Sequence, residues 1–201
     1  PLSENNQYCQ SFEVIGALEG TYTIGQKNIG LDKNFPTFDA ALEELYLRGM
    51  TAPVVFELTD AEYVAGDVFA QVPAIDLTSK ITGLSEENTL TFRPAPERRF
   101  SRGGVHLILR SGSGIGIKIG QEILPKSLNA PVYTVTEQMK KNYANSQGYI
   151  TFDGGQQKAM KVTIESTVPF RAPFYLGDGA SNITIRNIII SGDVEDPSMT
   201  T

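Results

Sequence analysis

Charged residues in the last third of the chain are the first candidates for chemistry. Five carboxylates could contribute oxygen ligands to Ca²⁺: Asp153, Asp178, Asp193, Glu195 and Asp196. Two cations could act as a base: Arg186 and Lys161. A Ca²⁺ site beside a cationic base would support elimination from a uronate sugar, because the sugar carboxylate must be neutralised before its α-proton can be removed. Asp153 precedes a glycine pair and is explained more simply as a turn residue whose carboxylate accepts backbone N–H groups.

Hydrolysis of a glycosidic bond needs carboxylates placed on both sides of that bond. The chain contains no adjacent pair of aspartates, and His106 is its only histidine. Because His106 lies between Val105 and Leu107 in an apolar run, we interpret it as a structural or surface residue. The sequence therefore predicts no catalytic residue, no metal site and no cofactor.

Three tyrosines are the best candidates for binding: Tyr133, Tyr143 and Tyr149. They lie in or beside a long polar stretch, residues 121–148, that interrupts the strand pattern. Aromatic rings can stack on sugars, although tyrosines near strands also serve as half-buried packing residues. We hypothesise that this stretch contributes to a surface that recognises a glycan or a partner protein.

Composition limits the classes of partner. The 201 residues include 40% hydrophobic and 20% charged residues, with a formal charge of −6. An acidic chain is a poor nucleic-acid binder because phosphate recognition needs a basic face. The cluster Arg98-Arg99-Phe100-Ser101-Arg102 is short and is interpreted as a solvated turn. No apolar run is long enough to span a bilayer, and the single Cys9 excludes an internal disulfide.

One helix is predicted near the N-terminus. Thr37 is a suitable N-cap, four apolar residues share one face, and Gly49 is placed to end the helix. The apolar residues are Phe38, Ala41, Leu42 and Leu45. A single apolar stripe must pack against something, so we expect this helix to cap the first coil of a repetitive fold.

The rest of the chain predicts an all-β domain of short strands separated by Gly, Asn, Asp and Pro. The segment 181–192 contains two β-branched runs separated by an Arg-Asn step, and Thr184 follows Thr163 by 21 residues. Short strands at about that spacing favour a parallel β-helix, a solenoid, over a sandwich, whose strands are longer and joined by tight hairpins. We expect a tail or edge strand at 1–19, a capping strand and helix at 20–50, and β-helix coils at 51–201 with an insertion at 121–148.

A family resemblance supports this expectation. The segments 20–25, 35–42 and 53–56, followed by 88–95, 148–154 and 182–192, resemble bacterial secreted proteins that have a pectin-lyase-like right-handed parallel β-helix. The resemblance implies an exported, cell-surface protein of which this chain is the N-terminal portion. Enzymes of this fold mostly cleave acidic polysaccharides.

Two classes of function remain open from the sequence. The favoured one is a non-catalytic extracellular segment, an adhesive or structural stalk that binds glycan or other surface proteins or stacks on further coils or chains. The alternative is a polysaccharide lyase or glycoside hydrolase whose active residues lie mostly beyond residue 201.

Overall fold

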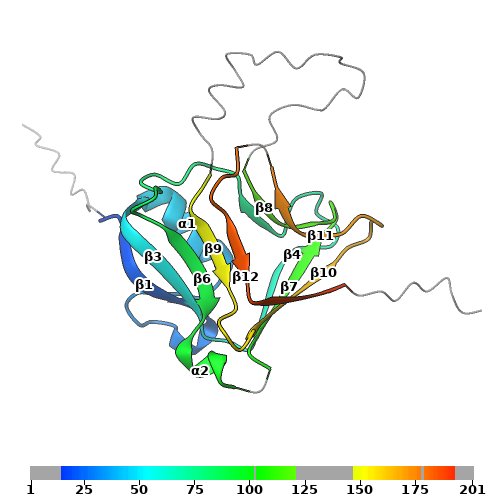
Figure 1. The fold of residues 1–201 in the computed structure, drawn as a ribbon, viewed down its shortest axis with the longest axis horizontal. Helices are drawn as coiled ribbons and strands as arrows, with labels where there is room; N and C mark the ends of the chain where they lie inside the picture. Colours follow the sequence, from blue (N-terminus) through cyan, green and yellow to red (C-terminus); the bar gives the residue numbers. More distant parts are fainter. Residues whose placement is uncertain (1–14, 102, 121–146, 178, 193–201) are drawn as a thin grey trace, which may run out of the picture.

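The computed structural model describes residues 15–101, 103–120, 147–177 and 179–192. It is mostly β, with three sheets in which every strand pairing is parallel (Figure 1). The first sheet contains, in spatial order, β12 (Thr184–Arg186), β9 (Ile150–Asp153), β6 (Leu90–Pro94), β3 (Met50–Leu58), β1 (Leu18–Ile24) and β2 (Asn34–Phe35).

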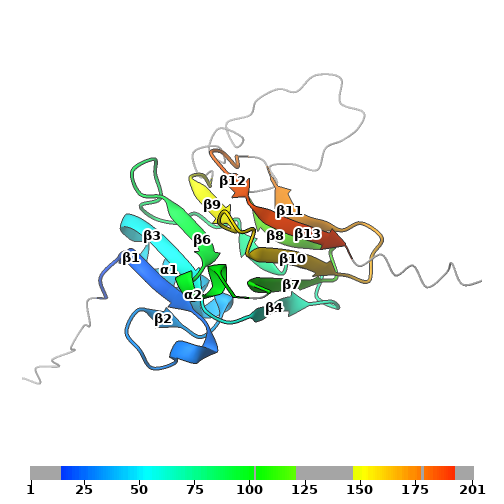
Figure 2. The same ribbon diagram turned by 60° about the horizontal axis from the view of Figure 1, so that its bottom comes forward.

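The second sheet contains β13 (Ile188–Gly192), β10 (Met160–Glu165), β7 (Val105–Ser111) and β4 (Glu62–Asp67), which lie side by side in Figure 2. The third contains β11 (Ala172–Leu176), β8 (Ile115–Ile119) and β5 (Ile75–Leu77). The helical elements are the 3₁₀ turn η1 (Gln26–Asn28), α1 (Phe38–Arg48) and α2 (Pro96–Arg99).

From β3 onward, each strand pairs with the strand three places later in the chain. We call each set of consecutive strands that contributes to the sheets a rung: β3 to β5, β6 to β8, β9 to β11, and the partial set β12 and β13. Successive rungs therefore place equivalent residues next to one another, and an inward side chain contacts its counterpart above and below.

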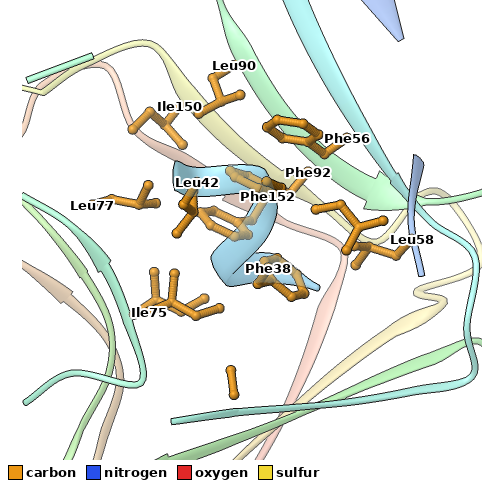
Figure 3. Packing of buried hydrophobic residues seen from close by; sticks show 14 of the residues in the cluster. Phe38, Leu42, Phe56, Leu58, Ile75, Leu77, Leu90, Phe92, Ile150 and Phe152 are labelled. Carbon is orange, nitrogen blue, oxygen red and sulfur yellow. The ribbon is translucent and has the colours of Figure 1, made fainter. Parts of the chain in front are cut away.

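Aromatic residues form the centre of the interior. The register aligns Tyr22 with Phe56, Phe56 with Phe92, and Phe92 with Phe152. The ring centroids of Phe56 and Phe92 are 5.3 Å apart, and those of Phe92 and Phe152 are 4.8 Å apart with the rings nearly parallel. Figure 3 shows these three rings among aliphatic side chains of the same cluster. We call Phe56, Phe92 and Phe152 the aromatic column.

The strands alternate between buried and solvent-facing residues, as the two-residue period of a strand requires. In β6 and β7 every second side chain is buried. Aliphatic residues continue the interior beside the aromatic column, as in the aligned series Val54, Leu90 and Ile150, all fully buried. One continuous core results.

The predicted helix is confirmed as α1. The Thr37 Oγ1 accepts a hydrogen bond from the Ala40 N–H at 3.2 Å, and Gly49 ends the helix with φ 66° and an N–H donated to the Leu45 carbonyl. A left-handed residue suits glycine at that position. The four predicted apolar residues are all buried in the main core. Phe38 lies between Phe92, at 6.0 Å, and Tyr63, at 5.5 Å between ring centroids.

The predicted spacing of about 21 residues is wrong. Thr163 pairs with Ser191, 28 residues later, whereas Thr184 pairs with Thr151, 33 residues earlier. Thr163 thus lies in the second sheet and Thr184 in the first. The similar residues beside them in the sequence do not mark equivalent positions of one repeat. The Arg-Asn step, Arg186 and Asn187, is where the chain turns from β12 to β13.

Four strands have only a weak strand pattern in the sequence because they are short or have few inward residues. β2 has two residues and β5 three, in β4 only Tyr63 and Ala65 are buried, and β11 has no fully buried side chain. Of the predicted tail and insertion, residues 1–14 and 121–146 lie outside the described ranges.

The aromatic column predicts a large loss of stability on truncation at its centre. Phe92 is fully buried between Phe56 and Phe152 and also contacts Phe38, so Phe92→Ala removes all three ring contacts and leaves a cavity. We expect it to lower the free energy of unfolding by about 3–5 kcal/mol, measured by urea denaturation followed by far-UV circular dichroism. The control is Phe69→Ala, because Phe69 is 80% exposed and its truncation should change stability by less than about 0.5 kcal/mol. Equal effects of the two substitutions would contradict the packing.

Candidate binding groove

The structure does not gather the three predicted tyrosines into a described site. Tyr133 and Tyr143 lie outside the described residues, and only Tyr149 can be placed. Tyr149 is half-buried with a left-handed φ of 57°. Its N–H donates to the Ser181 carbonyl at 3.3 Å and its carbonyl accepts from the Leu90 N–H at 3.1 Å. Its backbone therefore links rungs, and the binding role predicted for its ring stays a hypothesis.

Asp153 is the turn residue that the sequence predicts. Its Oδ1 accepts the Gly155 N–H at 2.9 Å and the Asn187 Nδ2 at 3.1 Å, and its Oδ2 accepts the Arg186 Nη2 at 2.8 Å. Arg186 ends β12 and points outward, with 61% of its side chain exposed. The other predicted carboxylates, Asp178, Asp193, Glu195 and Asp196, lie outside the described residues, and Lys161 lies on β10 in a different sheet.

His106 has a structural contact on the outer face of the second sheet. Its Nε2 is 2.8 Å from the Thr163 Oγ1, which is in turn 3.1 Å from the Ser191 Oγ. Partial burial, followed by the positive charge of Lys161, lowers the pKa of His106, while Glu62 and Glu165 oppose this. No group of three or more His, Cys, Asp or Glu side chains suited to a metal ion occurs in the described part of the chain.

Two adjoining concave surfaces lie where the first sheet turns into the second. One hollow, of about 520 Å³, is lined by Arg99, Phe100, Asp153, Gly155, Gln156, Gln157, Arg186 and Asn187. An adjoining hollow, of about 500 Å³, is lined by Arg99, Phe100, Ser101, Gly103, Gly104, Gln157, Lys158, Ala159 and Ile189. We call the two together the corner groove. Arg99, Phe100 and Gln157 line both hollows, so they mark the middle of the groove.

Three successive rungs build this groove. Its residues come from the β6–β7 connection containing α2, from the β9–β10 turn, and from the β12–β13 step (Figure 1). The connections lie close together: a Cβ added to Gly154 would stand 1.9 Å from the Asn187 carbonyl oxygen. That distance leaves no room for a side chain, which explains a glycine at this turn. The stacking register therefore fixes the relative positions of the lining residues.

Arg99 anchors the middle of the groove. Its Nε donates to the Pro94 carbonyl at 3.1 Å, and its Nη2 is 3.6 Å from the Glu57 Oε1, an ion-pair distance. The Nη2 is buried without a hydrogen-bond acceptor. Arg93 shares the same Glu57 oxygen at 2.8 Å. The Pro94 carbonyl and Glu57 therefore hold the guanidinium of Arg99 through its Nε and Nη2 atoms, and its Nη1 takes part in none of these contacts.

Several groups in the groove have no partner within the described residues. Phe100 is 79% exposed, and the side-chain amides of Gln156 and Gln157 make no hydrogen bond there. The sequence interpretation of residues 98–102 as a solvated turn did not identify the groove, and the structure places Arg98 and Arg99 at the end of α2. The sequence signal that could have identified the groove is an aromatic residue, Phe100, within a basic cluster between two predicted strands. The glutamines carried no signal, because only the register brings them beside Phe100.

Hydrogen bonds set the charge state of Asp153. Burial acts to raise the pKa of this carboxyl, but the Gly155 N–H, the Arg186 guanidinium and the Asn187 amide together outweigh burial and hold the pKa below its usual range. The carboxylate in the groove therefore stays ionised at mildly acidic pH.

Comparison with known proteins gives no relative: no family model, no curated protein and no solved structure matches the chain. Among the helices in the described ranges, none has the length and apolar character needed to cross a membrane.

The Asp153–Arg186 pair predicts an acid-dependent contribution to stability. Because the folded-state pKa of Asp153 is depressed, its stabilisation is present above the unfolded value, near 4, and is lost as pH falls through the folded value. Asp153→Asn should therefore lower the free energy of unfolding at pH 7 by about 1 kcal/mol or less, since Arg186 is exposed.

The measurement is urea denaturation of both proteins between pH 7 and pH 2.5, and the difference between them should shrink below about pH 4. The control is Asp32→Asn, at an exposed position where the carboxylate has no partner in the described part of the chain. A difference between wild type and Asp153→Asn that stayed constant with pH would refute the ion-pair assignment.

Proposed function

We propose that this chain is a segment of a right-handed parallel β-helix that acts as a non-catalytic structural or adhesive stalk on a bacterial cell surface. The observation that carries the proposal is the repeated register, which places Phe56, Phe92 and Phe152 in one column across three rungs. When each rung packs on the one before it in the same way, further rungs can be added and the same core continues through them.

The sheet topology supports the β-helical architecture. Each of the three sheets is parallel, and from β3 onward the chain returns to the same sheet only after it has passed through the other two. Parallel crossovers in one sheet are right-handed in nearly all proteins, because strands carry a right-handed twist. Right-handed winding is therefore the expected hand here.

Ion pairs between rungs support the role of a stiff stalk. Glu57 of β3 pairs with Arg93 of β6 at 2.8 Å, and Arg110 of β7 pairs with Glu165 of β10 at 2.8 Å. Asp153 and Arg186 form a third such pair. Each pair is worth little alone at an exposed surface, but all three connect neighbouring rungs outside the core. They oppose sliding of one rung past the next, because a shift of register would separate the charges.

The cell-surface and bacterial parts of the proposal depend on the resemblance of several segments to secreted β-helical proteins. The formal charge of −6 favours solubility and disfavours non-specific binding to nucleic acid, which suits an extended surface protein.

Cleavage of an acidic polysaccharide by residues of this chain is the competing function that can be tested directly. The purified chain is incubated with polygalacturonate and with alginate, with and without Ca²⁺, and unsaturated products are followed by ultraviolet absorbance and reducing ends by a colorimetric assay. We expect no turnover above a heat-denatured control. A commercial lyase on the same substrates confirms that the assay works. Turnover above that control would overturn the non-catalytic proposal, and its loss in Asp153→Asn would assign the reaction to this carboxylate.

A further inference from the structure

We propose that the corner groove is a binding site for an uncharged oligosaccharide of pyranose sugars, with Phe100 as the stacking platform. This inference deepens the proposed function and rests on it, since it names what an adhesive segment would hold. Tyr149, which is the predicted binding tyrosine that the structure describes, does not line the groove.

Phe100 is held in place although its ring is exposed. It follows α2 directly, and its N–H donates to the Arg98 carbonyl. The same carbonyl accepts the Ser101 hydroxyl at 3.1 Å, and the Arg98 Nε donates to the Thr59 carbonyl at 2.7 Å. The backbone beneath the ring is therefore fixed on the preceding rung. The ring is 79% exposed on this fixed backbone, so its face is open to a flat ligand.

Polar groups of both hydrogen-bonding types surround the ring. The free amides of Gln156 and Gln157 each offer a donor and an acceptor, and the Asp153–Arg186 pair offers a carboxylate beside a partly free guanidinium. Sugar hydroxyls are simultaneously donors and acceptors, so they can satisfy such a mixed set. Because Asp153 and Arg186 neutralise each other, this half of the groove has no strong preference for a charged ligand.

The second half of the groove is more apolar. Ala159 and Ile189 line it, and Ile189 is 48% exposed. Gly103 and Gly104 line the same hollow and present no side chain. The C–H face of a second sugar ring could lie on this surface while its hydroxyls reach Gln157 or Lys158. Each half has a volume in the range of small-molecule sites, so the groove fits a chain of more than one sugar.

The test uses the complete 201-residue chain and neutral oligosaccharides of β-1,4-linked glucose, mannose, xylose and N-acetylglucosamine, with polygalacturonate as a charged arm. Isothermal titration calorimetry measures binding to wild type, to Phe100→Ala and to the double variant Gln156→Ala/Gln157→Ala. We expect at least one neutral oligosaccharide to bind, and each variant to weaken that binding by about fivefold or more.

The matched control is Phe69→Ala, which removes a ring of almost equal exposure, 80%, in the turn after β4, away from the groove residues. Phe69→Ala should bind like wild type, and circular dichroism should show that all variants keep the fold. The proposal is overturned if no neutral oligosaccharide binds, if only polygalacturonate binds, or if Phe100→Ala binds unchanged. Those results would leave the stalk proposal standing, whereas polysaccharide turnover would overturn the stalk and leave binding at Phe100 intact.

Discussion

Contact between equivalent residues of successive rungs is the constraint on which the rest of the structure depends. Phe92 has Phe56 on one side and Phe152 on the other, each about one strand spacing away. The ring spacing and the backbone hydrogen bonds of the parallel ladder therefore reinforce each other. A shift of one residue in any of these strands would turn a phenylalanine outward and a valine, a threonine or a charged residue inward, so the register is strongly specified.

The same register organises the outer surface. Once Phe56 and Phe92 face inward and align, the next residues, Glu57 and Arg93, must face outward and align as well. Their ion pair is thus a consequence of the packing inside. The corner groove follows by the same logic, because Asp153 and Arg186 are register partners at the ends of β9 and β12.

The sequence predicted local features well where one element contains its own signal. The cap, the apolar face and the terminating glycine of α1 all lie within thirteen consecutive residues, 37–49, and all are confirmed. Asp153 was identified as a turn residue from the glycines beside it, and its bond to the Gly155 N–H bears this out. The parallel all-β character also followed from short strands between turn-forming residues.

Prediction failed where the outcome depended on which strands meet. Thr163 and Thr184 have similar neighbours, yet they pair in different sheets, because connection lengths vary from rung to rung. No local pattern reveals the connection lengths, so no single period could be read. The groove was missed for the same reason: Phe100 and Gln157 are far apart in the chain and become neighbours only through the stacked corner.

The close approach of Gly154 to Asn187 links the geometry of the groove to the packing of the core. The Gly154 Cα lies so close to the Asn187 carbonyl that a methyl group there would force the third and fourth rungs apart. Asn187 adopts a left-handed φ of 56° at this point and donates its amide to Asp153, so displacing its backbone would also disturb the Asp153–Arg186 pair. The absence of a side chain at Gly154 thus serves two purposes. It lets the rungs approach to the spacing that the aromatic column needs, and it places the polar half of the groove at that same spacing.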